Sequence, residues 1–76
     1  MRIEWSPRAK ATALPFMRDQ DGMRAIGEAI AALAEDPYPA GAFHRPGYHR
    51  LRVGRYRVQY DVADDLITVV RVDRVT

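Results

Sequence analysis

Five arginines in one short stretch are the residues of this chain best suited to bind phosphate. A guanidinium group donates paired, planar hydrogen bonds to phosphate oxygens, whereas the lysine ammonium acts as a point charge. The same stretch holds His44 and His49, and histidine is the side chain whose charge changes near neutral pH. Between residues 41 and 60 there is no acidic residue, and the arginines are Arg45, Arg50, Arg52, Arg55 and Arg57. The segment therefore indicates anion binding, with proton transfer as a second function to consider.

Alternation of these arginines with apolar residues predicts that a β-hairpin presents them on one face. The period of two runs from Tyr48 onward, and Gly54-Arg55 suits a two-residue type II′ turn, which has Gly first. The expected pairs are Val53 with Tyr56, Arg52 with Arg57 and Leu51 with Val58. One face is then basic, and the other is apolar and covered by helices. The apolar face comprises Leu51, Val53, Tyr56, Val58, Tyr60 and Val62.

A last strand at residues 66–72 brings a further arginine toward the basic face. If the preceding turn at 63–65 takes three residues, Arg71 lies opposite Arg57; if it takes two, Arg71 points to the core. We expect three, because burying an unpaired charge is costly. Like charges opposite one another destabilise a sheet. A face that keeps them without an interleaved acid is expected to bind a polyanion.

The histidines and Tyr48 are candidates for proton transfer. Residues 36–47 are rich in proline and glycine and predict a surface loop, so His44 is expected to be exposed beside the hairpin. His49 has the parity of the core face and is expected to be a hydrogen-bonded core residue. Tyr48 shares the basic face and is either a base-stacking or proton-donating residue or a plain strand aromatic. No residues stand at the spacing of metal ligands.

The elements that position these residues follow from the first half of the chain. Residues 1–5 alternate as a short strand, and Ser6-Pro7 is a helix start, with Pro15 expected to stop or kink that helix. Asp19 or Asp21 is expected to cap a second helix that ends before Pro37. Its apolar stripe has helical spacing and comprises Met23, Ile26, Ile30 and Leu33.

The fold class expected is α+β: an N-terminal strand, two helices, then a three-stranded antiparallel meander, forming one small sheet with helices on one face. With 76 residues the chain is expected to be a single domain, 1–76. It has no cysteine, which excludes disulfides and thiolate zinc sites. No apolar run resembles a signal core or a membrane span, so we expect a cytoplasmic protein that does not bind membranes.

This order of elements, together with three motifs, resembles the RelE/ParE superfamily of type II toxins, and in particular the RelE-like mRNA interferases. The motifs are SPRA after the first strand, AIAALAEDPYPAG at the end of the second helix, and LRVGRYRVQYDV in the hairpin. The resemblance covers nearly the whole chain. It implies a RelE-like fold, a cognate antitoxin that forms a heteromeric complex with the toxin, and cleavage of mRNA on the ribosome without a cofactor.

The resemblance also implies roles for individual residues. In such enzymes the 2′-hydroxyl of the RNA attacks the adjacent phosphate, so no nucleophilic side chain is needed. The arginine after the hairpin tyrosine is Arg57, which corresponds to the residue that binds phosphate in the transition state. Arg50 and Arg74, the latter taken to follow the last strand, complete the expected catalytic set. The residues expected to hold RNA are Arg52, Arg71, Tyr48, Arg45 and His44.

The chain departs from the family pattern at its C-terminal end and at Tyr48. VRVDR lacks the usual glycine and following basic residue, and the sequence ends at Val75-Thr76 without the arginine and aromatic residue of many active members. Tyr48 stands where the nucleases often have lysine, so Tyr48 or His44 is expected to supply the proton. Two alternatives follow: a ParE-type inhibitor of DNA gyrase that needs no catalytic groups, and an inactive homologue that acts as an antitoxin-bound DNA-binding complex.

Overall fold

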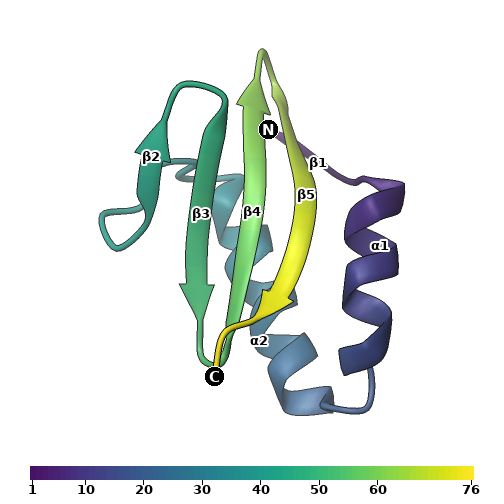
Figure 1. Cartoon of the computed structure of the whole chain (residues 1–76). Helices are drawn as coiled ribbons and strands as arrows, with labels where there is room; N and C mark the ends of the chain where they lie inside the picture. Colours follow the sequence, from purple (N-terminus) through teal and green to yellow (C-terminus); the bar gives the residue numbers. More distant parts are fainter.

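In the sheet, the first and last strands of the chain lie side by side, and one face of the sheet is not covered by helices (Figure 1). The computed structural model describes all residues, 1–76. The elements are β1 (Arg2–Trp5), α1 (Pro7–Ala13), a 3₁₀ turn η1 (Leu14–Phe16), α2 (Gln20–Leu33), β2 (Phe43–Arg45), β3 (Tyr48–Val53), β4 (Tyr56–Ala63) and β5 (Leu66–Arg74). The strand order is β1-β5-β4-β3-β2, with β1 parallel to β5 and the other neighbours antiparallel.

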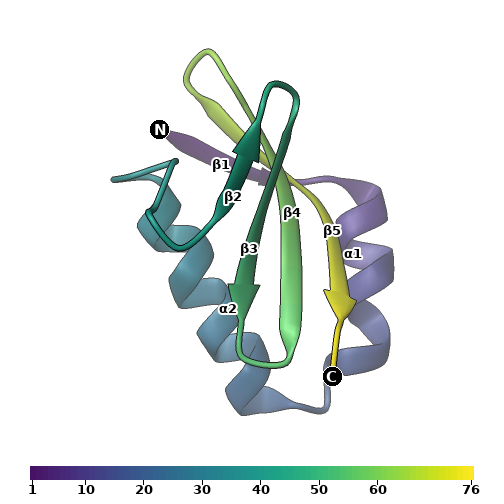
Figure 2. The same cartoon turned by 60° about the vertical axis from the view of Figure 1, so that its left-hand side comes forward.

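The helices begin and end where the sequence predicts. The Ser6 hydroxyl accepts a hydrogen bond from the amide of Ala9, with Pro7 at the first helical position, and Pro15 falls in η1 directly after α1. Asp19, rather than Asp21, caps α2 by accepting from the amide of Gly22 at 2.9 Å. Both helices pack against the same face of the sheet, as the turned view confirms (Figure 2). Neither helix has the length and apolar character needed to span a membrane.

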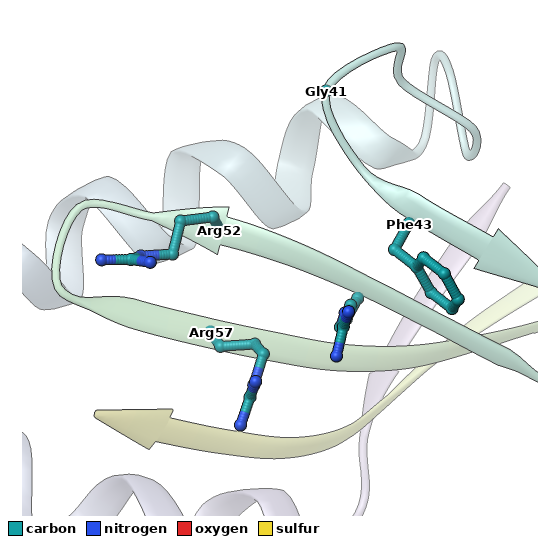
Figure 3. A pocket seen from close by; sticks show the side chains of 5 residues that line it. Gly41, Phe43, Arg52 and Arg57 are labelled. Carbon is teal, nitrogen blue, oxygen red and sulfur yellow. The ribbon is translucent and has the colours of Figure 1, made fainter. Parts of the chain in front are cut away.

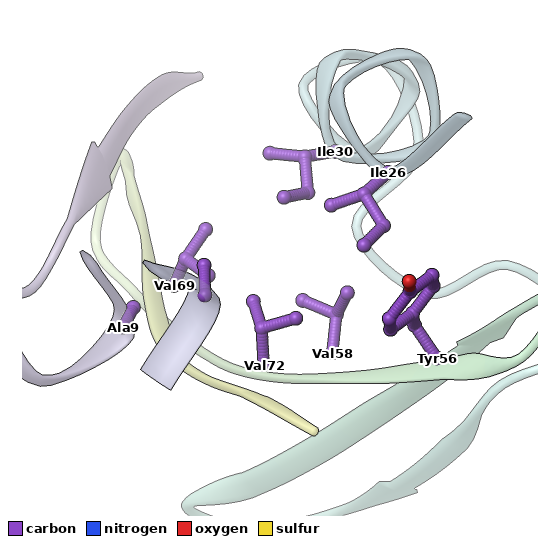
Figure 4. Close-up of a cluster of buried hydrophobic side chains, with 8 residues drawn as sticks. Ala9, Ile26, Ile30, Tyr56, Val58, Val69 and Val72 are labelled. Atoms are coloured by element: carbon purple, nitrogen blue, oxygen red, sulfur yellow. The ribbon is translucent and has the colours of Figure 1, made fainter. Parts of the chain in front are cut away.

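The core lies between the two helices and the helix-facing side of the sheet, with Ala9 and Ala13 of α1 among its buried residues (Figure 4). The α2 stripe points inward, with Ile26, Ile30 and Leu33 buried and Met23 half-buried. Tyr60 is fully buried, and its hydroxyl donates a 2.8 Å hydrogen bond to the carbonyl of Pro37. Burial raises the pKa of Tyr60 to about 12. This hydrogen bond attaches the segment that follows α2 to the helix-facing side of β4.

The α+β fold class is confirmed, but one strand was not predicted. Residues 36–47 were expected to be loop throughout, whereas Phe43–Arg45 forms β2 at the sheet edge and pairs with β3. The turn between them is Pro46-Gly47, and Gly47 has φ +75°, the residue order and conformation of a type II turn. The meander therefore has four antiparallel strands rather than three, because proline and glycine served here as hairpin turn residues.

The predicted register of the central hairpin is correct. Arg52 pairs with Arg57, Leu51 with Val58, and Val53 with Tyr56. Gly54 has φ +58° and Arg55 does not share a positive φ, as a type II′ turn requires. The apolar face is confirmed too, since Tyr56, Val58 and Tyr60 are buried. The arginines of β3 and β4 consequently lie on the face away from the helices.

A β-bulge in β5 changes how the last strand meets the others. The turn between β4 and β5 has two residues, Asp64 and Asp65, so the expected three-residue loop is wrong. The register then shifts at Gln59/Tyr60: Tyr60 pairs with Val69, but Gln59 pairs with Arg71. The extra residue restores Arg71 to the basic face. Arg71 lies opposite Gln59, however, and Asp73 occupies the expected place opposite Arg57.

Side chains of α1 satisfy the backbone around this bulge. The Ser6 hydroxyl donates to the carbonyl of Val70 at 3.2 Å, and the Thr12 hydroxyl accepts from the amide of Val72 at 3.0 Å. A bulge interrupts the ladder and leaves polar groups that need partners. These hydrogen bonds therefore stabilise the β-bulge that places Arg71 on the open face of the sheet.

Candidate nucleic-acid interface

Three guanidinium groups share one pocket on the open face of the sheet (Figure 3). Arg50 and Arg52 come from β3, and Arg57 comes from β4. Gly41 and Phe43 complete the wall of this hollow of about 260 Å³. No carboxylate lines it, and neither Arg50 nor Arg57 makes an ion pair. Arg52 is held at the turn, where its Nε donates to the carbonyl of Gly54 at 2.7 Å.

A second hollow, of about 310 Å³, adjoins the first because both are lined by Arg57. Its floor carries Gln59, with Tyr48 on one side and Arg71 and Arg74 on the other. Arg74 is the last residue of β5, not a residue beyond it, and its Nε donates to the carbonyl of Thr76 at 2.9 Å. The two hollows form a continuous basic surface across three strands, with Arg57 at their junction.

The basic surface contains one acid, which corrects the expectation of a cluster without one. Asp73 lines the second hollow, and its Oδ1 lies 2.7 Å from Nε of Arg71. The side chains of Arg71 and Asp73 remain partly exposed, at 42% and 26%. Asp73 neutralises Arg71 and leaves Arg57 free of an ion pair. The arginines of the two hollows that have no ion pair are thus Arg50, Arg52, Arg57 and Arg74.

A third hollow contains an aromatic residue that was missed from sequence. It has a volume of about 390 Å³ and is lined by Phe43, Arg45, Pro46, Tyr48 and Arg50. Phe43 is 37% exposed and belongs to no hydrophobic cluster of the core. The signal that identifies its position is the near-repeat FHR-PG-YHR, which reads as two paired strands joined by Pro-Gly.

Both histidines lie on the helix-facing side of the sheet. His44 pairs with His49 across β2 and β3, whereas Phe43 and Arg45 have the opposite parity. The Nδ1 atoms of the two histidines are 3.0 Å apart, and Nε2 of His44 lies 3.1 Å from the carbonyl of Pro39. His49 is buried and hydrogen-bonded, as expected. The expectation of an exposed His44 is wrong: it is half-buried and separated by the sheet from the arginine pocket.

The electrostatics of the histidine pair oppose a second positive charge. Burial and the neighbouring His44 lower the pKa of His49, and Asp61 acts in the opposite direction to a smaller extent. The lowered pKa favours the neutral ring of His49. Of the side chains predicted to hold RNA, the structure brings together Arg45, Tyr48, Arg52 and Arg71 on the open face, with the predicted catalytic residues Arg50, Arg57 and Arg74.

Comparison with known proteins identifies the family. The family model described as the ParE toxin of the type II toxin-antitoxin system, parDE, matches residues 3–75. The chain belongs to the ParE toxin family. Among curated proteins, none matches it. This ParE-family toxin is thus the toxin of a type II toxin-antitoxin system, and an antitoxin is its implied partner.

Within this ParE-family toxin, the arrangement offers cations but few groups that transfer protons. The arginine pocket can neutralise one or two phosphates of a nucleic acid backbone. Tyr48 is the hydroxyl-bearing side chain that shares a hollow with Arg57. No three His, Asp or Glu residues gather where they could hold a metal ion. The site is therefore suited to bind a polyanion and to stabilise negative charge on it.

Proposed function

We propose that this toxin is an endoribonuclease that cleaves mRNA on the ribosome and so inhibits translation. The observation that carries the proposal is the pocket in which Arg50, Arg52 and Arg57 converge without a carboxylate. Like-charged groups held together in this way are relieved by an anion, and phosphodiester oxygens match the guanidinium fork. RNA supplies its own nucleophile, so a protein that provides cations at the phosphate already provides a large part of the catalysis.

The proposed reaction is an internal transesterification. The RNA 2′-hydroxyl attacks the adjacent phosphorus and loses its proton to the surrounding solvent, and the bond from phosphorus to the 5′-oxygen breaks. The products are a 2′,3′-cyclic phosphate and a 5′-hydroxyl. Arg57 and Arg50 stabilise the negative charge that builds up on the phosphate oxygens, and Arg52 and Arg71 bind neighbouring phosphates. Arg45 and Arg74 extend this contact to the RNA on either side.

Tyr48 is the proposed donor of the proton to the leaving 5′-oxygen. It lines a hollow together with Arg57, and its side chain is half-buried on the open face. His44, the other residue expected in this role, lies across the sheet from the pocket. The geometry therefore favours Tyr48 over His44 as the source of the proton.

A second candidate function is inhibition of DNA gyrase by binding alone. It is favoured by the position of both histidines on the helix-facing side, because a binding toxin needs no group that transfers a proton. It also agrees with the name of the matching family. In this case the same arginine surface would bind an acidic surface of the target rather than the RNA backbone.

We further propose that the antitoxin forms a complex with this chain by covering the arginine surface. An acidic or apolar antitoxin segment over Arg50, Arg52 and Arg57 would relieve their mutual repulsion and block access of RNA. A complex of this kind also stabilises a small domain through binding. Adding the antitoxin should therefore raise the melting temperature and abolish RNA binding together.

The test pairs Arg57→Ala with Arg55→Ala as a matched control. Arg55 is an exposed turn residue that lines none of the hollows described above, so its removal leaves the pocket intact. Each purified variant is added to translating ribosomes, and cleavage is mapped by the ends of the mRNA fragments. We expect Arg57→Ala to lower the cleavage rate by about 100- to 1,000-fold, the range seen when one transition-state donor is removed. Arg55→Ala should cleave at the wild-type rate.

A supercoiling assay with gyrase separates the two candidates. Intact mRNA together with inhibited supercoiling would contradict the nuclease proposal and support gyrase inhibition. Growth of cells that express the chain without antitoxin completes the test. Unimpaired growth in the presence of folded protein would contradict both candidate functions.

A further inference from the structure

We propose that Phe43 forms a subsite that stacks on an unpaired nucleobase next to the phosphate held by Arg57. This inference rests on the proposed binding of RNA and specifies which part of the RNA, besides its backbone, the surface recognises. The ligand class is a base of single-stranded RNA, because a base in a duplex has its faces covered by its neighbours.

The position of Phe43 is the first observation. Phe43 lines both the arginine pocket and the 390 Å³ hollow beside it, and Arg50 is the other residue that the two hollows share. A nucleotide whose phosphate lies among Arg50, Arg52 and Arg57 would therefore place an adjacent base against this ring. The neighbouring hollow has a volume within the roughly 300–1,000 Å³ range of ligand pockets.

The second observation is that this partly exposed apolar ring lies outside the core. Phe43 lies on the edge strand β2, is 37% exposed and contacts neither cluster of the core. The open face of the sheet otherwise carries arginines and polar residues at the positions that flank it. An aromatic ring in this place gains nothing from burial in the core, and its exposed part can contact a ligand.

The third observation is the set of groups around the ring. The guanidinium carbon of Arg50 lies 4.6 Å from the ring centroid and that of Arg45 lies 5.2 Å away. The Tyr48 ring approaches edge-on, with centroids 6.1 Å apart. Arginine next to an exposed aromatic ring is the combination that single-stranded nucleic acid binders use, since the cation binds phosphate and the ring binds the base.

The experiment compares two oligomers with the same number of phosphates. One is a 5′-labelled 2′-O-methyl oligoadenosine, in which the blocked 2′-oxygen prevents cleavage, and the other is the same backbone without bases. Affinity is measured by fluorescence anisotropy for the wild type, Phe43→Ala, Phe43→Trp and Arg57→Ala. Because both oligomers carry equal charge, the ratio of their affinities reports the contribution of the bases alone.

We expect the wild type and Phe43→Trp to bind the oligoadenosine about 5- to 150-fold more tightly than the base-free backbone, the range of one base stacked on an aromatic ring. Phe43→Ala should bring this ratio close to one, because the ratio cancels any change in phosphate binding that follows from altering the pocket wall. Circular dichroism confirms that each variant is folded. Arg57→Ala should weaken the binding of both oligomers and keep their ratio.

Two results would overturn the inference in distinguishable ways. If Phe43→Ala keeps the wild-type ratio while Arg57→Ala weakens both oligomers, RNA binding stands and the base subsite is wrong. If the wild type binds neither oligomer, the proposed RNA function fails, and the base subsite fails with it.

Discussion

The hydroxyl of Tyr56 donates a 2.6 Å hydrogen bond to the carboxylate of Asp19, which is the residue that caps α2. Tyr56 is the first residue of β4, directly after the turn that carries Arg55. This bond joins the tip of the basic hairpin to the start of the helix beneath it. The hydrogen bond lowers the pKa of Asp19 and raises that of Tyr56.

Tyr56→Phe should destabilise the protein at pH 7 and return the pKa of Asp19 toward its ordinary value of 3.8. A lowered pKa contributes stability that is present above 3.8 and is lost as pH falls through the folded-state value. The difference in melting temperature between wild type and variant should therefore shrink at about pH 2. Thermal melts and an NMR titration of the Asp19 carboxyl check both points. An unchanged Asp19 pKa in the variant would show that the bond is not formed.

Gly22→Ala should destabilise the protein through a clash at the same contact. A Cβ atom there would overlap the carboxylate of Asp19 and would lie 2.7 Å from Cε2 of Tyr56. Overpacking of this kind costs about 1–3 kcal/mol. Gly27 is the matched control in the same helix, because a Cβ there meets nothing within 4 Å. Gly27→Ala should stabilise the protein by about 0.5–1 kcal/mol, as replacing a mid-helix glycine does. Urea denaturation of the two variants measures both changes, and equal effects would contradict the close approach.

Thr12→Val should weaken the support of the bulge in β5. It keeps the shape of the side chain but removes the oxygen that accepts from the amide of Val72. A buried donor left unpaired costs about 1–3 kcal/mol. Thr12→Ser retains the hydroxyl and should preserve most of the stability. Hydrogen exchange at the Val72 amide should accelerate in Thr12→Val alone; similar exchange in both variants would argue that another group satisfies this amide.

The stability of the protein should fall as pH drops below about 6.5, and His49 should account for this dependence. A carbonyl only accepts, so a neutral His44 that donates to Pro39 through Nε2 can only accept from His49 through Nδ1. The lowered pKa of His49 means that its contribution is present above the ordinary value of 6.5 and is lost at lower pH. The groups that face the pair are Tyr38, Tyr60 and Asp61.

His49→Phe tests this assignment because it keeps an aromatic ring against Tyr60, which stacks on His49 with centroids 5.3 Å apart. Melting temperatures between about pH 7.5 and 5 should decline in the wild type and stay nearly level in the variant. A decline of equal steepness in both proteins would show that other groups cause the pH dependence.

Local sequence patterns predicted the parts of the fold that are determined by residues close together in the sequence. Ser6-Pro7 gave the start of α1, and Gly54-Arg55 fixed the register that puts Arg52 opposite Arg57. These features depend on backbone conformations that particular residues favour. The same reasoning misplaced His44, because proline and glycine in its segment were taken as signs of a loop rather than of a second hairpin.

The bulge was beyond prediction for a different reason. Nothing in LITVVRV marks Val70 as the extra residue, since the segment has no glycine and Val70 itself has no polar side chain. Its place is decided by Ser6 and Thr12, which are far away in sequence and bind the backbone on either side of Arg71. Consequently the face on which Arg71 lies was predicted correctly, but its cross-strand partner was not.

This single extra residue determines how the toxin should be compared with its relatives. If a homologue lacks it, a gap-free alignment would match Arg71 with a residue of the opposite face, although the letters on both sides would still look alike. Equivalent arginines in the family must therefore be assigned by counting strand pairs from the Gly54 turn rather than by position from the C-terminus. One insertion or deletion in β5 is therefore enough to move an arginine between the two faces of the sheet, even where the rest of the strand sequence is unchanged.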